Sequence, residues 1–322
     1  MQCSMSSTSN KPGTAPPVDA IIAVTPDRHR EAVACLLSNN RDGHAGARRF
    51  LDYARQNGVS LESMWSLVDG RGAIQATVLG VPSPGRTAML FATRTSSRQN
   101  AAPIARLIDH ACAGLRQRDV DLAQALLDPG DDAARSCYIE AGFTMLACLS
   151  YMQRPIRASD SAIRVEWPDD FVVEPYDAGR RDELINLLDE TYIDTLDCPG
   201  LVGLRDARDI LTGHECVGET SAHEWHVLRH KGRAVGVLML NPSSGGETVE
   251  LVYLGLAPSA RGKRLGATLL RSGLARLAGR RQQSVTLAVD QRNRPAVALY
   301  EHEGFRIVLE RMAMIRSLRK QG

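Results

Sequence analysis

Two copies of one short motif constrain the fold of this 322-residue chain more than any other feature. The motif Tyr-x-x-x-Gly-Phe occurs at Tyr138–Phe143 and again at Tyr300–Phe305. The two tyrosines are 162 residues apart (300 − 138), which is about half the chain. In each copy a helical segment ends at a glycine, which suits the left-handed position after a helix, and an apolar strand follows. A repeat of this length predicts two domains built on one plan.

The elements around the motif repeat as well. Each half ends in a predicted strand, helix and strand: Leu122–Leu127, a short helix with Tyr138, and Met145–Gln153, then Ser284–Val289, Pro295–Glu303 and Phe305–Met314. Each half also has a predicted hairpin, around Gly70–Gly72 and around His230–Arg233, so neither sheet is purely parallel. The sequence therefore predicts an α/β fold of two tandem domains, each with a mixed, mostly antiparallel sheet flanked by helices.

Changes in composition along the chain indicate where the domains begin and end. Residues 1–18 are rich in Ser, Thr, Pro and Gly and predict a disordered leader. The N-terminal domain is predicted over residues 19–154 and the C-terminal domain over residues 170–322. A polar linker over residues 155–169 joins them.

Charge and cysteine content exclude several classes of protein. With 39 Lys and Arg against 37 Asp and Glu, the net charge is +2, so neither a nucleic acid nor a membrane surface is an expected partner. No apolar run approaches the roughly 20 residues that span a bilayer, and no signal peptide is visible. The seven cysteines are odd in number and form no CxxC pair, which favours reduced thiols and a cytoplasmic location.

One loop in the C-terminal half suits phosphate binding. A strand predicted over Thr248–Leu256 enters the loop Arg261–Gly266, and a helix over Gly266–Ala278 follows. Amide groups at the start of a helix have no partner within it and face the positive end of its dipole. The two glycines let the backbone approach a ligand, and two basic residues add positive charge. The loop matches neither the Walker A nor the dinucleotide pattern, so a plain turn is the alternative interpretation.

Together with two later residues, this loop resembles that of the GNAT superfamily of acetyl-CoA-dependent N-acetyltransferases. The family loop reads Arg/Gln-x-x-Gly-x-Gly/Ala. Here Arg261 and Gly266 match its first and last positions, while Arg264 stands in place of the middle glycine. Family members carry an asparagine after the next strand and a tyrosine in a helix that ends Gly-Phe, which Asn293 and Tyr300 match.

The resemblance covers residues 225–316 closely and residues 170–224 loosely. The N-terminal half resembles the same fold without the phosphate loop, because Arg94–Asn100 contains no glycine. A tandem arrangement with a catalytic C-terminal domain and a degenerate N-terminal domain is implied. Acetyl-CoA is the implied co-substrate, held by Leu254, Gly255, Leu256, Arg261, Gly262, Lys263, Arg264, Leu265, Gly266, Ala267, Thr268, Asn293 and Tyr300.

The resemblance also implies catalytic roles. An amine has an ordinary pKa of about 10.4, so it must lose a proton before it attacks a thioester. The resemblance implies that Glu250 is this base, because several family members have a carboxylate at its position. Glu247 is the fallback candidate. A solvent-facing strand glutamate without a catalytic role is the alternative interpretation of Glu250. Tyr300, whose hydroxyl has an ordinary pKa of about 10, would protonate the departing thiolate. The alternative interpretation of Tyr300 is an aromatic side chain that only packs in the core. A backbone N–H near Leu254–Leu256 would polarise the carbonyl group.

The acceptor is expected opposite the cofactor, against the irregular segment Tyr192–Leu204. Asp197, Cys198 and Glu250 are the predicted acceptor-binding residues, with Asp197 attracting a cationic amine. An aspartate that caps the turn before Cys-Pro-Gly explains Asp197 equally well. The histidines show no ligand spacing on one face, so no metal is predicted.

These features predict an N-acetyltransferase that transfers an acetyl group to a primary amine of a small molecule by direct attack. A non-catalytic acyl-CoA sensor or regulatory module is the first alternative, and a peptide or protein N-acetyltransferase is the second. The expected assembly is a monomer or a homodimer.

Overall fold

The computed structural model describes residues 19–38, 43–95, 101–218, 224–243 and 246–319, and the predicted leader over residues 1–18 lies outside these ranges. The N-terminal half contains helices α1 (His29–Leu36), α2 (Gly43–Gln56), α3 (Ala101–Arg116) and α4 (Asp132–Glu140), and strands β1 (Ala20–Ala23), β2 (Met64–Val68), β3 (Ile74–Ser83), β4 (Thr87–Ala92), β5 (Leu122–Leu127) and β6 (Thr144–Pro155). The C-terminal half contains α5 (Arg181–Tyr192), α6 (Ala207–Glu215), α7 (Leu265–Leu277) and α8 (Arg294–His302), and β7 (Phe171–Pro175), β8 (Trp225–His230), β9 (Arg233–Pro242), β10 (Thr248–Leu256), β11 (Ser284–Asp290) and β12 (Arg306–Ser317).

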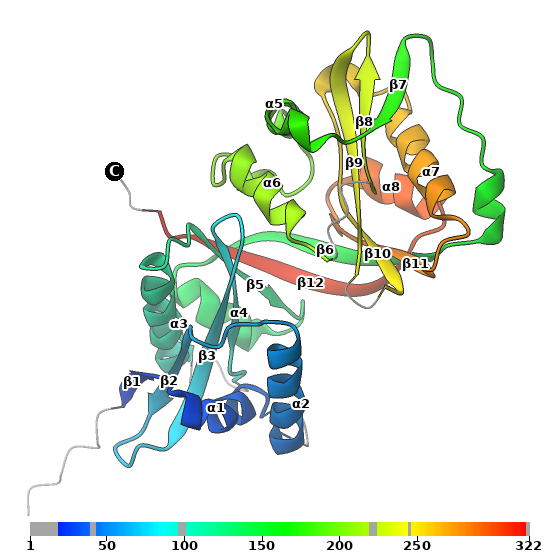
Figure 1. Cartoon of the computed structure of the whole chain (residues 1–322). Helices are drawn as coiled ribbons and strands as arrows, with labels where there is room; N and C mark the ends of the chain where they lie inside the picture. Colours follow the sequence, from blue (N-terminus) through cyan, green and yellow to red (C-terminus); the bar gives the residue numbers. More distant parts are fainter. Residues whose placement is uncertain (1–18, 39–42, 96–100, 219–223, 244–245, 320–322) are drawn as a thin grey trace, which may run out of the picture.

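The strands of the described residues form one continuous 12-stranded sheet in the order β1-β2-β3-β4-β5-β12-β6-β11-β10-β9-β8-β7. Most neighbouring strands are antiparallel, and the pairs β4–β5 and β10–β11 are parallel. In the C-terminal half, α5 and α6 cover one face of the sheet while α7 and α8 cover the other (Figure 1). The predicted fold class is confirmed, and the structure adds that the two predicted sheets are continuous with each other.

The two halves exchange their last strands. Strand β6 belongs to the N-terminal half by sequence, yet both of its neighbours, β11 and β12, come from the C-terminal half. Strand β12 is likewise flanked by β5 and β6 of the N-terminal half. Figure 1 shows these two long strands, in green and red, running side by side between the halves. The predicted boundary near residue 155 therefore divides the chain at the end of an exchanged strand, not between two separate sheets.

The repeat that the sequence indicates extends over this whole unit. Adding 162 to the bounds of β5, α4 and β6 gives the first residues of β11, α8 and β12, for example 132 + 162 = 294. The helix caps also correspond, since Asp131 accepts a hydrogen bond from Ala134 N and Asn293 accepts one from Ala296 N. An acidic or amide side chain at this position satisfies an amide group that the helix leaves unpaired. The two units are thus built from the same local interactions.

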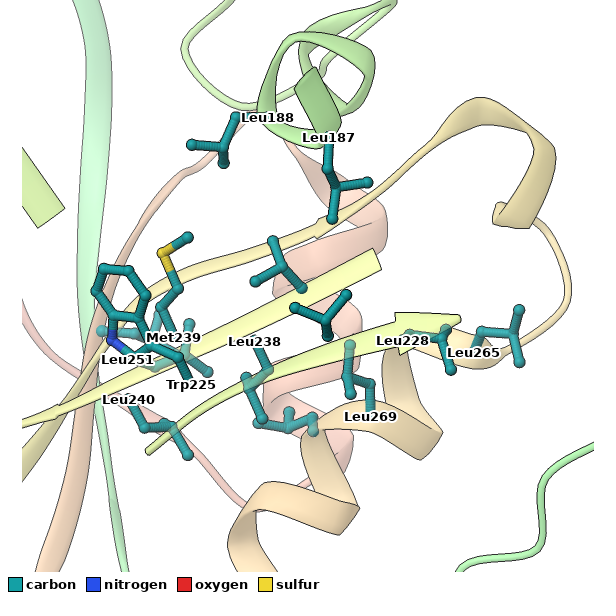
Figure 2. Close-up of a cluster of buried hydrophobic side chains, with 14 of the residues drawn as sticks. Leu187, Leu188, Trp225, Leu228, Leu238, Met239, Leu240, Leu251, Leu265 and Leu269 are labelled. Atoms are coloured by element: carbon teal, nitrogen blue, oxygen red, sulfur yellow. The ribbon is translucent and has the colours of Figure 1, made fainter. Parts of the chain in front are cut away.

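Buried apolar side chains between the sheet and the helices of the C-terminal half form its core (Figure 2). Trp225 is 1% exposed, and its indole N–H donates to Asn241 Oδ1 at 2.5 Å. The amide group of Asn241 then donates to the carbonyl oxygens of His214 and Val217. A buried polar side chain is stable only when it is hydrogen bonded, and this one fixes the end of α6 to β9.

Helix α7 approaches the sheet so closely that a residue larger than glycine at one position must displace a neighbouring side chain. A Cβ atom at Gly273 would lie 2.4 Å from Leu238 Cδ2 and 3.0 Å from Leu240 Cδ1. We expect Gly273→Ala to lower the free energy of unfolding by about 1–3 kcal/mol, because the clash outweighs the better helix propensity of alanine. The measurement is urea unfolding, monitored by circular dichroism.

Gly46 in α2 is the matched control for that variant. A Cβ atom there would lie 3.6 Å from Leu37 Cδ1, an ordinary contact. Gly46→Ala should therefore raise the free energy of unfolding by about 0.5–1 kcal/mol. If both variants were stabilised to the same extent, the close approach of α7 to β9 would be contradicted.

Candidate active site

The site is organised by a divergence of two parallel strands. Strands β10 and β11 pair only from Thr248 to Glu250, opposite Ser284 to Thr286. Beyond Glu250 the described residues form no further pair between them, although β10 continues to Leu256. A β-bulge follows on the β9 side, between Leu251 and Tyr253. Beyond Glu250, β10 therefore has no partner strand on its β11 side, and this open edge includes Leu254, Gly255 and Leu256.

The predicted phosphate loop connects this open end to α7. Gly262 has φ 74° and Arg264 has φ 60°, both in the left-handed region that favours glycine. The left-handed conformation explains why the family has a glycine at the position of Arg264. The first bond of α7 is Thr268 N to Arg264 O at 3.2 Å, so the helix leaves the amide groups of Leu265, Gly266 and Ala267 without a partner. A Cβ atom at Gly262 would meet nothing within 4 Å, so the loop faces open space.

The side chain of Arg261 bonds to three backbone carbonyl groups, while its predicted contact with the cofactor stays a prediction. Its Nε donates to Leu256 O at 3.0 Å, one terminal nitrogen to Ile193 O at 2.7 Å, and the other to Thr191 O at 2.8 Å. These backbone carbonyls use the donors that would otherwise face an anion. Lys263 donates to Ser259 O at 2.9 Å within the loop.

Glu250 lies at the last paired position before the strands diverge. It keeps exposed surface, but protein atoms displace enough water from its carboxyl group for this desolvation to raise its pKa above the ordinary 4.5. On β6, burial and then the negative charge of Glu250 raise the pKa of Tyr151. A strand of the N-terminal half therefore contributes to the surroundings of Glu250. Glu247 precedes β10, at the paired end of the strands, and its carbonyl oxygen accepts from Gln283 N.

Tyr300 on α8 is 6% exposed and packs edge-on against Phe305 at 5.7 Å between ring centres. Burial, followed by the charge of Asp197, raises its pKa. Its hydroxyl makes no hydrogen bond to any of the residues that the structure describes. The corresponding Tyr138 on α4 differs, because its hydroxyl donates to Leu90 O on β4 at 3.2 Å. Only the C-terminal tyrosine thus keeps its hydroxyl available.

The side chains of Asp197 and Asn293 both accept hydrogen bonds from backbone amides. Asp197 Oδ1 accepts from Asp290 N at 3.0 Å, and Asn293 Oδ1 accepts from Ala296 N at 3.3 Å. Desolvation is the largest effect on Asp197 and raises its pKa. The carboxylate of Asp197 therefore bonds to a backbone amide distant in sequence and does not cap the turn that follows it, while contact with an amine stays a prediction.

Cys198 lies within the irregular segment and packs against apolar side chains of the sheet. It contacts a cluster that contains Leu146 and Leu149 of β6, and burial raises its thiol pKa to about 12. A thiol with so high a pKa is protonated at neutral pH and is a poor nucleophile. The structure therefore gives Cys198 a packing role.

Tyr253 is a neighbour of the site that sequence reasoning missed. Its ring lies over Gly255, where a Cβ atom would be 2.5 Å from Tyr253 Cε1, so this glycine makes room for the tyrosine. Its hydroxyl bonds to Thr191 Oγ1 at 2.7 Å, and its ring lies 5.5 Å from that of His214. The bulge that turns Tyr253 toward α5 has no sequence signal beyond the glycine two residues later.

The residues that the structure describes contain neither a candidate metal site nor a helix that could span a membrane. They include no group of three or more His, Cys, Asp or Glu side chains placed to hold a metal ion. Within the same ranges, every helix is too short or too polar to cross a lipid bilayer.

Residues 182–305 match the model of the Acetyltransferase (GNAT) family. This match, the divergent strands and the amide-lined loop together identify the C-terminal half as a GNAT acetyltransferase domain. Over 312 residues the chain is 25% identical to a mycothiol acetyltransferase of Streptomyces avermitilis, covering 91% of this chain and 93% of the relative. Two shorter matches, to other mycothiol acetyltransferases at 44% and 48% identity, span only 21% and 18% of those relatives.

Solved structures show the same fold across the whole chain. A GCN5-related N-acetyltransferase from Sphaerobacter thermophilus superposes with a TM-score of 0.58 at 15% identity, covering 94% of this chain and 96% of that one. A tandem GNAT protein from the clavulanic acid biosynthesis pathway superposes with a TM-score of 0.53 at 13% identity, covering 95% and 99%. The tandem GNAT arrangement that the sequence predicts is confirmed.

Proposed function

We propose that this protein is an acetyl-CoA-dependent N-acetyltransferase whose C-terminal domain transfers an acetyl group to a primary amine of a small molecule. One observation carries the proposal: Glu250 stands where β10 and β11 part, and the same strand leads directly to the amide-lined loop before α7. A carboxylate and an anion-binding loop on one strand would hold a base and an activated acyl group in a fixed relation.

The residues of this site fit acetyl-CoA. Unpaired amides at the start of α7 and the open space at Gly262 suit a pyrophosphate group. The unpaired edge of β10, from Leu254 to Leu256, suits the amide groups of an extended pantetheine arm, which would add to the sheet as a strand does. When bound, acetyl-CoA supplies an acyl group activated as a thioester.

The proposed transfer uses two side chains. Glu250 accepts a proton from the protonated amine, whose nitrogen then attacks the thioester carbonyl carbon. The carbon–sulfur bond breaks, and the Tyr300 hydroxyl donates its proton to the departing thiolate. The second proton of the attacking nitrogen passes to the Tyr300 oxygen, which leaves a neutral amide and restores the hydroxyl group. The high pKa of Tyr300 keeps the hydroxyl protonated before the step.

The acceptor is proposed from the comparison over nearly the full chain. Because 91% of the chain aligns with a mycothiol acetyltransferase, the acceptor of that enzyme is the first amine to test. At 25% identity the acceptor site can differ, so other small amines belong in the same panel.

Tyr300→Phe tests the proposed acid. We expect kcat to fall roughly 10- to 100-fold. This loss is small for the removal of a general acid, because a thiolate is already a good leaving group. Thiol release from acetyl-CoA is the measurement. Tyr138→Phe, the corresponding change in the N-terminal half, is the control, and we expect it to leave kcat within about twofold while costing about 1 kcal/mol of stability. Equal losses in both variants would remove the catalytic assignment of Tyr300.

A further inference from the structure

A short segment after α5 crosses the open end of the diverging strands. We name residues Thr191–Cys198 the strap. Near its start, Thr191 bonds to Tyr253 on β10. Near its end, Asp197 bonds to Asp290 N at the end of β11. The strap is therefore attached to both of the strands that part at the site, and it spans the opening between them.

Arg261 joins the strap to the phosphate loop. Its guanidinium group contacts Thr191 O and Ile193 O on the strap at 2.8 and 2.7 Å, and Asp194 O at 3.5 Å. The same side chain donates to Leu256 O, the last residue of β10, at 3.0 Å. Arginine has five N–H donors in a rigid planar group, so it holds several carbonyl oxygens in fixed positions in a way that lysine does not.

The strap presents apolar side chains outward. Ile193 is 52% exposed and Leu196 is 55% exposed. Asp194 and Cys198 both have positive φ, at 51° and 46°, a conformation that a non-glycine residue keeps only when surrounding contacts enforce it. The bonds of Arg261 and Asp197 are such contacts. When these bonds break, we expect the backbone of the strap to leave this unfavourable conformation.

We propose that Arg261 is a positioning residue that couples the cofactor loop to the strap, so that occupation of the loop orders the acceptor side of the site. The proposal rests on the proposed function, because it takes CoA as the ligand of the loop. Its physical basis is that one guanidinium group bonds to both segments, so displacement of one disturbs the bonds to the other. Arg261 thereby acts on the acceptor through the strap and not as a ligand of phosphate.

Hydrogen exchange with and without CoA tests the coupling. In the full-length wild type, CoA should slow exchange in peptides from the phosphate loop and also in peptides from the strap. In Arg261→Lys and Arg261→Gln, CoA should still protect the loop but should no longer protect the strap. Calorimetry on the same samples should give CoA dissociation constants within about threefold of wild type.

Arg233→Gln is the matched control. Arg233 on β9 donates to the side chain of Glu190 on α5 at 2.6 Å, close to the start of the strap. Among the residues that the structure describes, its hydrogen bonds do not include the strap carbonyls. This variant should keep both protected regions. In steady-state kinetics, both Arg261 variants should raise the KM for the amine about tenfold with a smaller change in the KM for acetyl-CoA, because the strap is misplaced.

Three results would overturn the coupling. The first is protection of the strap by CoA in both Arg261 variants, and the second is no protection of the strap in the wild type although the loop is protected. The third is loss of CoA binding in Arg261→Gln with normal binding in Arg261→Lys, which would make the charge a phosphate ligand. Failure of the proposed function has a different signature, since the wild type would then not bind CoA at all.

Discussion

A chain that begins at residue 165 is expected not to form a folded monomer. It lacks β6, which in the intact protein lies between β11 and β12 and pairs with both. Without the N-terminal half, β12 loses every strand that flanks it and β11 gains an unpaired edge. Exposed strand edges and the uncovered apolar surface favour aggregation or pairing with a second copy. Size-exclusion chromatography and circular dichroism should find only aggregate or a dimer.

The control for truncation keeps every strand. Co-expression of residues 1–164 with residues 165–322 cuts the chain in the exposed connection between β6 and β7. The two pieces should assemble into a complex with the secondary structure of the intact protein, because the exchanged strands hold them together. A cooperative, monomeric C-terminal fragment would contradict the paired positions of β6 and β12.

Glu250→Gln is expected to lower kcat/KM by about 100- to 1,000-fold, the range typical of a lost general base. Glutamine keeps the size of the side chain and removes its ability to take a proton. In the wild type, activity should rise with pH through the pKa of Glu250, because the base acts when deprotonated. Desolvation raises that pKa, so this rise should lie above the ordinary value of 4.5 and should disappear in the variant.

Glu247→Gln separates the two candidate bases. Glu247 stands before β10 at the end where the strands remain paired, so its loss should change kcat/KM by less than about twofold. A large loss in this variant with near-normal activity in Glu250→Gln would transfer the role to Glu247. Thiol release from acetyl-CoA between pH 5 and 9 is a suitable measurement for both variants.

Local sequence signals were sufficient for most of the secondary structure. The strand Leu122–Leu127 and the strand Thr248–Leu256 have the bounds that their apolar patterns predict. Helix α6 was missed, although Ala207, Ile210 and Leu211 are buried on one face with helical spacing. A short helix with a glycine inside it gives a weak signal within a segment that otherwise has turn residues.

The exchange of β6 and β12 could not be predicted in the same way. Both strands are long, and in β12 the residues from Arg306 to Glu310 are exposed while those from Met312 to Ile315 are buried. Neither burial pattern indicates whether a strand pairs with its own half or with the other. Strand register and partner choice depend on contacts between residues far apart in the sequence. The repeat with its 162-residue offset reveals two equal units but not how they are joined.

The loop was easier to predict than its side chains. A strand, two glycines and a helix start suffice to predict unpaired amides, and the structure has them after Leu256. Arg261 was assigned to the cofactor from its match to the family loop and Asp197 to an amine from its charge. Their side chains bond to backbone groups, several of them in segments distant in sequence. Such partners depend on how the strap crosses the open strands, which no local pattern encodes.

The exchanged strands limit how the duplicated halves can diverge. The C-terminal unit depends on the final strand of the N-terminal unit, because the charge of Glu250 raises the pKa of Tyr151 on β6 and Met152 of that strand is buried in the C-terminal core. Neither repeat alone contains the complete sheet, so a substitution in β6 must suit both halves at once.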